Sequence, residues 1–296
     1  MKKPLVVVTG KNGQLGWELQ QLASSYENSY RFVFADRDSL NLQMPETIVP
    51  FLAELQPRYI INCAAYTAVD KAETEQEQAL MINATAVGTM AAFCEKNNCK
   101  FITVSTDYVF NGNGTSPYKT GTPTEPVNYY GYSKMAGEQL AQENNPSSVI
   151  VRTSWVYSVH GNNFVKTMLR LMKERDELKV VGDQVGSPTY AADLAQALMQ
   201  IIEEDQQGNC HSGIYHFSNT GVISWFDFAT AIREYAGFSV NLVAVPSTEY
   251  PTPAKRPAYS VMDTASFSNH FNVELQHWKL SLHRCMDLLQ MKNKYS

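Results

Sequence analysis

The segment "NYYGYSK" (residues 128–134) places a phenol and an amine where they could act together. Tyr130 and Lys134 are four residues apart, so in a helix they share a face, and among the sixteen tyrosines only Tyr130 has a lysine at that spacing. An ammonium beside a phenol lowers a pKa that starts near 10, which favours acid–base chemistry. Sixteen tyrosines would give about one such pair by chance, so the surrounding residues must decide.

Two hydroxyls follow a strand-like run in "VSTDYVF". Ser105 and Thr106 end this run, and parallel α/β sheets collect their site residues at the carboxyl ends of the strands. Either hydroxyl could hold a substrate carbonyl beside the tyrosine. The alternative is that both merely cap the next turn.

A glycine loop lies near the start of the chain, in "VVVTGKNGQLG". Gly10, Gly13 and Gly16 follow an expected strand and open an expected helix, an arrangement that lets the backbone and the helix N-terminus hold a pyrophosphate. Asp36 follows 20 residues after Gly16, where an acid can bind ribose hydroxyls. Asp36 favours NADH and the adjacent Arg37 favours NADPH, so both cofactors stay open. The alternative is an ordinary βα turn that binds no dinucleotide.

The elements that must position these residues alternate along the first two thirds of the chain. Short β-branched runs separated by helical patterns are typical of a parallel sheet covered on both faces. The expected fold class is therefore α/β, a Rossmann-type doubly wound parallel sheet. We expect strands within 4–10, 31–36, 59–65, 100–110 and 148–157, and helices within 14–24, 45–56, 77–97 and 129–144.

The rest of the chain predicts a smaller C-terminal lobe. We expect residues 1–155 to form the NAD(P)-binding domain, with a returning segment near 190–207, and residues 156–296 to form mainly a substrate-binding lobe. The proline-rich stretch 245–260 cannot be regular for long. Further expected features are a helix over 163–178, a loop over 182–190, a helix over 191–205, a capping box at Ser224 and Asp227, and a closing helix within 276–292.

Composition excludes several other classes. The 296 residues are 44% hydrophobic and 18% charged with a net charge of −5, and the basic residues are scattered, so we expect neither nucleic-acid nor membrane binding. No stretch approaches the roughly 20 apolar residues that cross a bilayer. The five cysteines form no CxxC pair and the histidines lack metal-ligand spacing. We expect a cytoplasmic protein with small-molecule ligands and no structural metal.

With these motifs in order, the chain resembles the extended short-chain dehydrogenase/reductases, through TGxxGxxG, the strand-end Ser/Thr and YxxxK. The segments "INCAAYTAVDKAE", "STDYVFNG", "RTSWVY", "GNNFVKTML", "GDQVGSPTY" and "RPAYSVMD" narrow the resemblance to the dTDP-4-dehydrorhamnose reductases. This resemblance implies hydride transfer from NADPH or NADH to C4 of a dTDP-linked 4-keto-6-deoxy sugar, which yields dTDP-L-rhamnose.

The resemblance also implies residue roles. It selects Thr106 over Ser105 to orient the carbonyl, gives Tyr130 the proton transfer, and has Lys134 lower the tyrosine pKa and bind the nicotinamide ribose. Asn83 matches a site-supporting position. For Trp155 the alternative is a core aromatic, and for Arg256 a solvated surface residue. The implied cofactor contacts are Gly10, Asn12, Gly13, Gln14, Leu15, Asp36, Arg37, Ala64, Ala65, Tyr66, Tyr130 and Lys134, and the implied substrate contacts are Val69, Thr106, Tyr108, Trp155, Asn163, Gln184 and Arg256.

Two features depart from the family pattern. The run "LNLQ" has Asn41 where the family often has an acid, and only Glu18 is a candidate ligand for the magnesium ion around which some relatives form homodimers. Two other functions stay open: a reductase of another nucleotide-linked 4-keto sugar, and a regulatory subunit that binds a dinucleotide without catalysis, like the related beta subunit of methionine adenosyltransferase.

Overall fold

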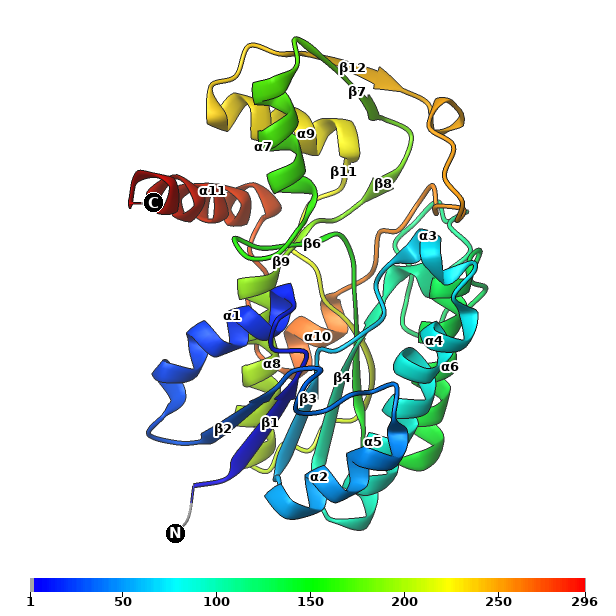
Figure 1. Cartoon of the computed structure of the whole chain (residues 1–296), viewed down its shortest axis with the longest axis vertical. Helices are drawn as coiled ribbons and strands as arrows, with labels where there is room; N and C mark the ends of the chain where they lie inside the picture. Colours follow the sequence, from blue (N-terminus) through cyan, green and yellow to red (C-terminus); the bar gives the residue numbers. More distant parts are fainter. Residues whose placement is uncertain (1–2, 296) are drawn as a thin grey trace.

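Six parallel strands form the central sheet of the computed structural model, which describes residues 3–295, with side chains as far as residue 291. The spatial order is β10-β5-β4-β3-β1-β2, so the strand order reverses between β1 and β3 (Figure 1). Such a switch point is where α/β sheets bind ligands. The strands are β1 (Leu5–Thr9), β2 (Arg31–Ala35), β3 (Tyr59–Asn62), β4 (Lys100–Thr106), β5 (Val149–Thr153) and β10 (Gly213–His216).

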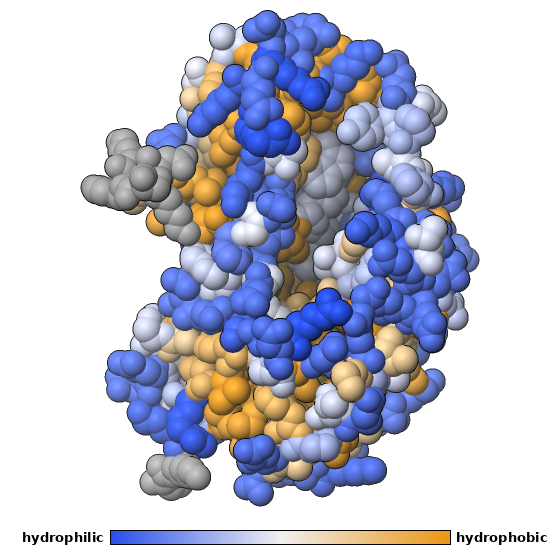
Figure 2. Space-filling view, viewed as in Figure 1, coloured by the Kyte–Doolittle hydropathy of each residue, from blue (hydrophilic) through white to orange (hydrophobic). Residues whose placement is uncertain are grey.

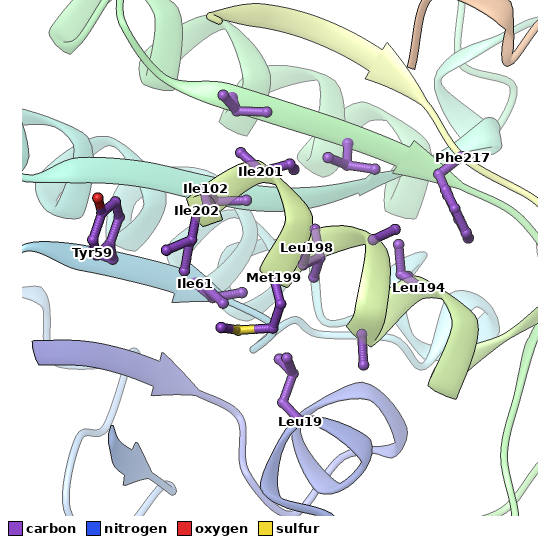
Figure 3. Close-up of a cluster of buried hydrophobic side chains, with 14 of the residues drawn as sticks. Leu19, Tyr59, Ile61, Ile102, Leu194, Leu198, Met199, Ile201, Ile202 and Phe217 are labelled. Atoms are coloured by element: carbon purple, nitrogen blue, oxygen red, sulfur yellow. The ribbon is translucent and has the colours of Figure 1, made fainter. Parts of the chain in front are cut away.

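Alternation along the strands builds one core on each face of the sheet. Val6 and Val8 pack toward one face, while Leu5 and Val7 pack toward the other, because successive side chains of a strand point in opposite directions. On the first face, Ile61 and Ile102 of the sheet meet Leu194, Leu198 and Ile202 of α8 (Figure 3). The first face is covered by α1 (Gln14–Ala23), α8 (Ala191–Gln206) and α10 (Ala265–His270), and the second by α2 (Ile48–Leu55), α5 (Ala86–Lys96) and α6 (Tyr129–Asn144).

A second group of elements lies beyond the carboxyl ends of the strands and has its own apolar core (Figure 1). It contains α7 (Phe164–Glu174), α9 (Trp225–Ala236) and α11 (Trp278–Tyr295). Strands β7 (Glu177–Val181) and β12 (Asn241–Val245) pair in parallel at its far side. Two short pairs connect it to the sheet: β6 (Val156–Tyr157) with β9 (Thr189–Tyr190), and β8 (Val185–Gly186) with β11 (Ile223–Ser224).

The expected fold class, the five expected strands and the capping box at Ser224 and Asp227 are confirmed. The helix expected over 163–178 is wrong at its end. Helix α7 stops at Glu174, and residues 177–181 form β7, whose side chains alternate between exposed and buried as in a half-buried strand. Its partner β12 lies 64 residues later, so local sequence could not show the pairing.

Two further expectations need correction. The loop over 182–190 contains the short strands β8 and β9, and the sheet has a sixth strand, β10, that was not expected. Strand β10 and helix α10 belong to the part of the chain beyond 207, yet they pack with the sheet. The functional division at residue 155 stays a prediction. Within residues 3–295, no helix combines the length and apolar character needed to span a membrane.

A buried ion pair joins α6 to β5, the strand next to the β10 edge of the sheet. Arg152 of β5 donates two hydrogen bonds to the carboxylate of Glu138, at 2.8 and 2.6 Å, and both side chains are at most 5% exposed. The guanidinium also lies over the Phe110 ring at 5.0 Å. Because neither charge can reach water, each depends on the other.

Removing one partner should therefore destabilise the fold. We expect Glu138→Gln to lower the free energy of unfolding by about 3–5 kcal/mol, since it leaves Arg152 charged and buried. Glu174→Gln is the matched control, because its pair with Arg170 is exposed and should contribute no more than about 0.5 kcal/mol. Urea denaturation of both variants measures the difference, and equal midpoints would contradict this account.

Candidate functional site

A cleft of about 960 Å³ opens at the carboxyl ends of the strands, beneath the second group of elements. The face shown in Figure 2 is hollowed between the two halves of the molecule. Most residues expected at the site from sequence lie on its wall, because parallel strands deliver their following loops to one edge. These are Gly10, Asn12, Gly13, Gln14, Leu15, Asp36, Arg37, Ala64, Ala65, Tyr66, Val69, Thr106, Tyr108, Tyr130, Lys134 and Trp155.

Two glycines of the loop between β1 and α1 lie too close to other backbone for any side chain. A Cβ on Gly10, which has a φ of +71°, would lie 2.7 Å from the backbone nitrogen of Ala64. A Cβ on Gly16 would lie 2.3 Å from the carbonyl oxygen of Gly10. Helix α1 begins after Gly13, which has no side chain to cap it, and its first residues, Gln14 and Leu15, line the cleft. This arrangement can hold a phosphate.

The charges at the far end of this loop include a lysine that the sequence reasoning missed. The Lys11 ammonium lies 2.7 Å from a carboxylate oxygen of Asp36, and Ser39 donates to the same carboxylate. These contacts, first the one with Lys11, hold the pKa of Asp36 well below its usual range. Arg37 is exposed beside it and donates to Gln43. The charge of Asp36 is thus compensated by Lys11, and Arg37 adds a second cation next to it.

Helix α6 carries the tyrosine and the lysine to the end of β4. The Asn128 side chain caps it by accepting from the N–H of Gly131 at 2.8 Å. A Cβ on Gly131 would lie 2.1 Å from the carbonyl oxygen of Tyr108, and a Cβ on Gly137 would lie 2.0 Å from that of Asn83. Only glycine permits these two approaches, which set how close α6 lies to the turn after β4 and to the helical segment Met81–Thr85.

The Tyr130 phenol lies at the cleft wall, enclosed by protein on its other sides. Burial raises the pKa of Tyr130 to about 12, Thr106 acts in the opposite direction through a side-chain hydrogen bond, and the charge of Asp107 raises it further. The expected lowering of the Tyr130 pKa by Lys134 is not among these effects, and burial is the largest of them. The phenol therefore holds its proton at neutral pH, as a proton donor must. Its ring meets the Tyr108 ring edge-on at 5.6 Å.

Lys134 is buried and directed at the end of β4. Its ammonium donates to the carbonyl oxygen of Val104 at 2.7 Å. Burial lowers the pKa of Lys134 to about 8, against the opposing effects of Glu138 and Cys63. An ammonium has three N–H donors, so two are left for a ligand in the cleft.

Asn83 ties two parts of the site together, in the place expected for a supporting residue. Its side chain exchanges hydrogen bonds with the backbone N–H and carbonyl of Tyr66, at 2.8 and 3.0 Å. It also donates to the Ser133 hydroxyl at 2.9 Å, and Ser133 in turn donates to the carbonyl of Tyr130. The loop after β3 and the first turn of α6 therefore hold one position relative to each other.

Comparison with known proteins places the chain in a family. The family described as "RmlD substrate binding domain" matches residues 3–291, which is nearly the whole chain. The chain belongs to this family. A dTDP-4-dehydrorhamnose reductase of Burkholderia thailandensis is 41% identical over 297 residues, covering 96% of this chain and 99% of the relative. One of Escherichia coli K12 is 41% identical over 291 residues, covering 96% and 97%.

The solved structures agree with the sequence comparison. The crystal structure of a Bacillus anthracis dTDP-4-dehydrorhamnose reductase in complex with NADP superposes with a TM-score of 0.91 and 40% identity. It covers 96% of this chain and 99% of that one. This member of the RmlD family thus keeps the complete architecture of relatives that carry that name.

Three residues expected to contact substrate in this family member are not on the cleft wall. Asn163 caps α7, accepting from the N–H of Lys166 and donating to Gln14 at 3.0 Å. Arg256 forms an ion pair with Asp70 at 2.8 Å, and one of its guanidinium nitrogens is buried without a hydrogen-bond partner. Gln184 lies in the loop before β8. Their contacts with substrate stay predictions.

A tryptophan that sequence reasoning missed completes the wall. Trp225, the first residue of α9, stacks on Trp155 with ring centroids 3.6 Å apart and planes 11° from parallel. Both line the cleft. Trp155 has a φ of +48°, a left-handed backbone that costs about 1–3 kcal/mol for such a residue. Its ring fills the space left by Gly186, whose Cβ would lie 2.7 Å from it. Only the fold brings the two rings together, across 70 residues.

The magnesium expectation is not supported further. Glu18 is buried and accepts a hydrogen bond from Ser158 at 2.6 Å. In the part of the chain that the structure describes, no three His, Cys, Asp or Glu side chains are grouped as metal ligands. A magnesium-bound homodimer and a cytoplasmic location stay predictions.

The tryptophan stack gives a direct test of this site. Two indoles in face-to-face contact couple their transitions, so we expect an exciton couplet in the far-ultraviolet circular dichroism spectrum. Trp225→Leu should abolish the couplet and release Trp155 from its strained backbone. Trp278→Phe is the control, since that core tryptophan meets Phe228 edge-on and 5.9 Å away. A couplet that survives in Trp225→Leu would contradict the stacked arrangement.

Proposed function

We propose that this chain reduces the C4 ketone of dTDP-4-dehydro-L-rhamnose to dTDP-L-rhamnose, with NADPH or NADH as the reductant. The proposal is supported by membership in the RmlD family and by relatives named dTDP-4-dehydrorhamnose reductase that match almost end to end. The observation that carries it is the meeting of Thr106, Tyr130 and Lys134 on one wall of the cleft that begins at the glycine loop. This reaction is the last step in making the dTDP-linked sugar.

The residues at the cleft fit a nicotinamide dinucleotide. Gly10 and Gly16 have no room for a Cβ, and the loop that they begin and end leads into the N-terminus of α1, where a pyrophosphate would be held. Asp36 and Arg37 would lie at the adenosine end, and Lys134 at the nicotinamide ribose. The bound cofactor supplies the hydride that reaches C4 of the sugar. The complex of the Bacillus anthracis relative with NADP is consistent with this choice.

The chain's own residues supply the proton and the orientation. As C4 of the ketone receives a hydride, its oxygen gains negative charge and takes the phenolic proton of Tyr130, and solvent then reprotonates the phenolate. Thr106 holds the reacting oxygen in place. Lys134 would stabilise the phenolate as it forms, while burial keeps the pKa of Tyr130 raised, at about 12.

The sugar nucleotide would occupy the rest of the cleft. Val69, Tyr108 and the Trp155–Trp225 stack form an apolar wall suited to the face and methyl group of a 6-deoxy sugar. Arg256 is the proposed diphosphate contact, and it would have to exchange Asp70 for the phosphates. Asn163 and Gln184 are proposed near the same diphosphate.

The acid is tested by a matched pair of variants. We expect Tyr130→Phe to lower the rate of NADPH oxidation with dTDP-4-dehydro-L-rhamnose by about 10²–10⁴-fold, because it removes the proton that the ketone oxygen takes up. Tyr132→Phe, an exposed position on the same helix, should keep the wild-type rate. No oxidation by a folded, cofactor-bound wild type would overturn the function, and full activity of Tyr130→Phe would overturn the role of the acid.

The cofactor preference is tested at Arg37. An arginine that binds the 2′-phosphate contributes through a charged hydrogen bond, so Arg37→Ala should raise KM for NADPH about tenfold or more. KM for NADH should stay unchanged, since that cofactor has no phosphate there. Arg170→Ala on α7 is the control for loss of an exposed arginine. Equal changes for both cofactors would exclude phosphate recognition by Arg37.

A further inference from the structure

The carboxyl group of Asp107 is buried directly behind the site. Asp107 follows β4 and is 2% exposed. Its Oδ1 accepts a hydrogen bond from the Thr106 hydroxyl at 2.9 Å, while its Oδ2 is buried without a hydrogen-bond partner among the described side chains. The Ser260 hydroxyl also lowers the pKa of Asp107, but Oδ2 still has no hydrogen-bond partner. A buried polar atom without a partner is costly, so its presence beside the reacting groups requires an explanation.

The hydrogen bonds of Thr106 determine what it can offer a ligand. A hydroxyl has one hydrogen and two lone pairs. The hydrogen goes to Asp107, and one lone pair accepts from the backbone N–H of Tyr108 at 3.3 Å. Only one lone pair is left for the cleft. In this state Thr106 can accept a hydrogen bond, for example from the Tyr130 phenol, but it cannot donate one to a ketone oxygen.

We propose that Asp107 is a positioning residue that sets whether Thr106 donates or accepts a hydrogen bond in the cleft. An ionised Asp107 takes the Thr106 hydrogen and leaves the hydroxyl as an acceptor. A protonated Asp107 can donate to the Thr106 oxygen instead, which frees the Thr106 hydrogen for the ketone. The second state suits the reduction, and the first suits the product, whose C4 hydroxyl is a donor. This inference rests on the proposed reductase function.

The surroundings of the carboxyl allow both states near neutral pH. Burial raises the pKa of Asp107 to about 6, against the effects of Thr106 and Ser260. The titratable groups that face it are Tyr108 and Tyr130, and its charge raises the pKa of both. The cations on neighbouring elements are bonded elsewhere: Lys134 to the carbonyl of Val104, Arg152 to Glu138, and Arg256 to Asp70.

The test is the pH dependence of kcat with saturating NADPH and dTDP-4-dehydro-L-rhamnose. A carboxyl with a pKa of about 6 is half protonated at pH 6 and about one-hundredth protonated at pH 8, so wild-type kcat should drop about fiftyfold between these pH values. Asp107→Asn cannot ionise, and its kcat should stay level over this range while KM changes little. A variant that keeps the wild-type decline would overturn the inference.

Variants at Thr106 give a second measurement that needs no change at Asp107. Thr106→Ser keeps the hydroxyl and should keep the decline, whereas Thr106→Val should be slower and lack it. If both variants show the wild-type decline, the inference is wrong. A wild type that turns over in the same assay preserves the proposed function in that case, whereas a folded wild type without activity overturns the function itself.

Discussion

Helix α6 can lie against the turn after strand β4 and against the helical segment Met81–Thr85 because two of its residues have no Cβ. Gly131 lies against the backbone of Tyr108, and Gly137 lies against the backbone of Asn83, so closely that a methyl group on either glycine would overlap a carbonyl oxygen. The rest of the site depends on this approach. It places the Tyr130 phenol beside the Thr106 hydroxyl and brings the Lys134 ammonium to the carbonyl of Val104.

The close approach also removes water from behind the reacting groups. Three ionisable side chains are buried on elements around the phenol: Asp107 after β4, Lys134 on α6 and Arg152 on β5. Their charges are compensated to different degrees. Arg152 is compensated by Glu138, Lys134 is bonded to a carbonyl, and the Asp107 carboxyl keeps one oxygen, Oδ2, without a hydrogen-bond partner. In a region of low dielectric, the first pair stabilises the fold, while the incompletely bonded groups are those whose protonation can change during a reaction.

Local sequence patterns were sufficient to predict several elements of the fold and part of the site. The run of Val6, Val7 and Val8 predicts a strand buried on both faces, and the Tyr130–Lys134 spacing predicts a shared helix face, because both depend on neighbouring residues alone. Strand β7 could not be predicted, since "ERDEL" reads as helix until β12 supplies its partner. The direction of the Tyr130 pKa shift was also wrong, because burial of the phenol is a property of the packed site.

The sequence by itself determined five strands of the sheet, the glycine loop and the Tyr130–Lys134 pair, since each follows from spacing within a single element or turn, whereas the choice of Thr106 over Ser105 came from the family resemblance. Only the tertiary structure decided what surrounds them. Trp225 stacks on Trp155, Lys11 neutralises Asp36, Arg256 pairs with Asp70, and Asp107 takes the hydrogen of Thr106. Burial and most of these contacts join distant segments, and the direction of a hydroxyl hydrogen depends on every group around it, so no local pattern encodes them.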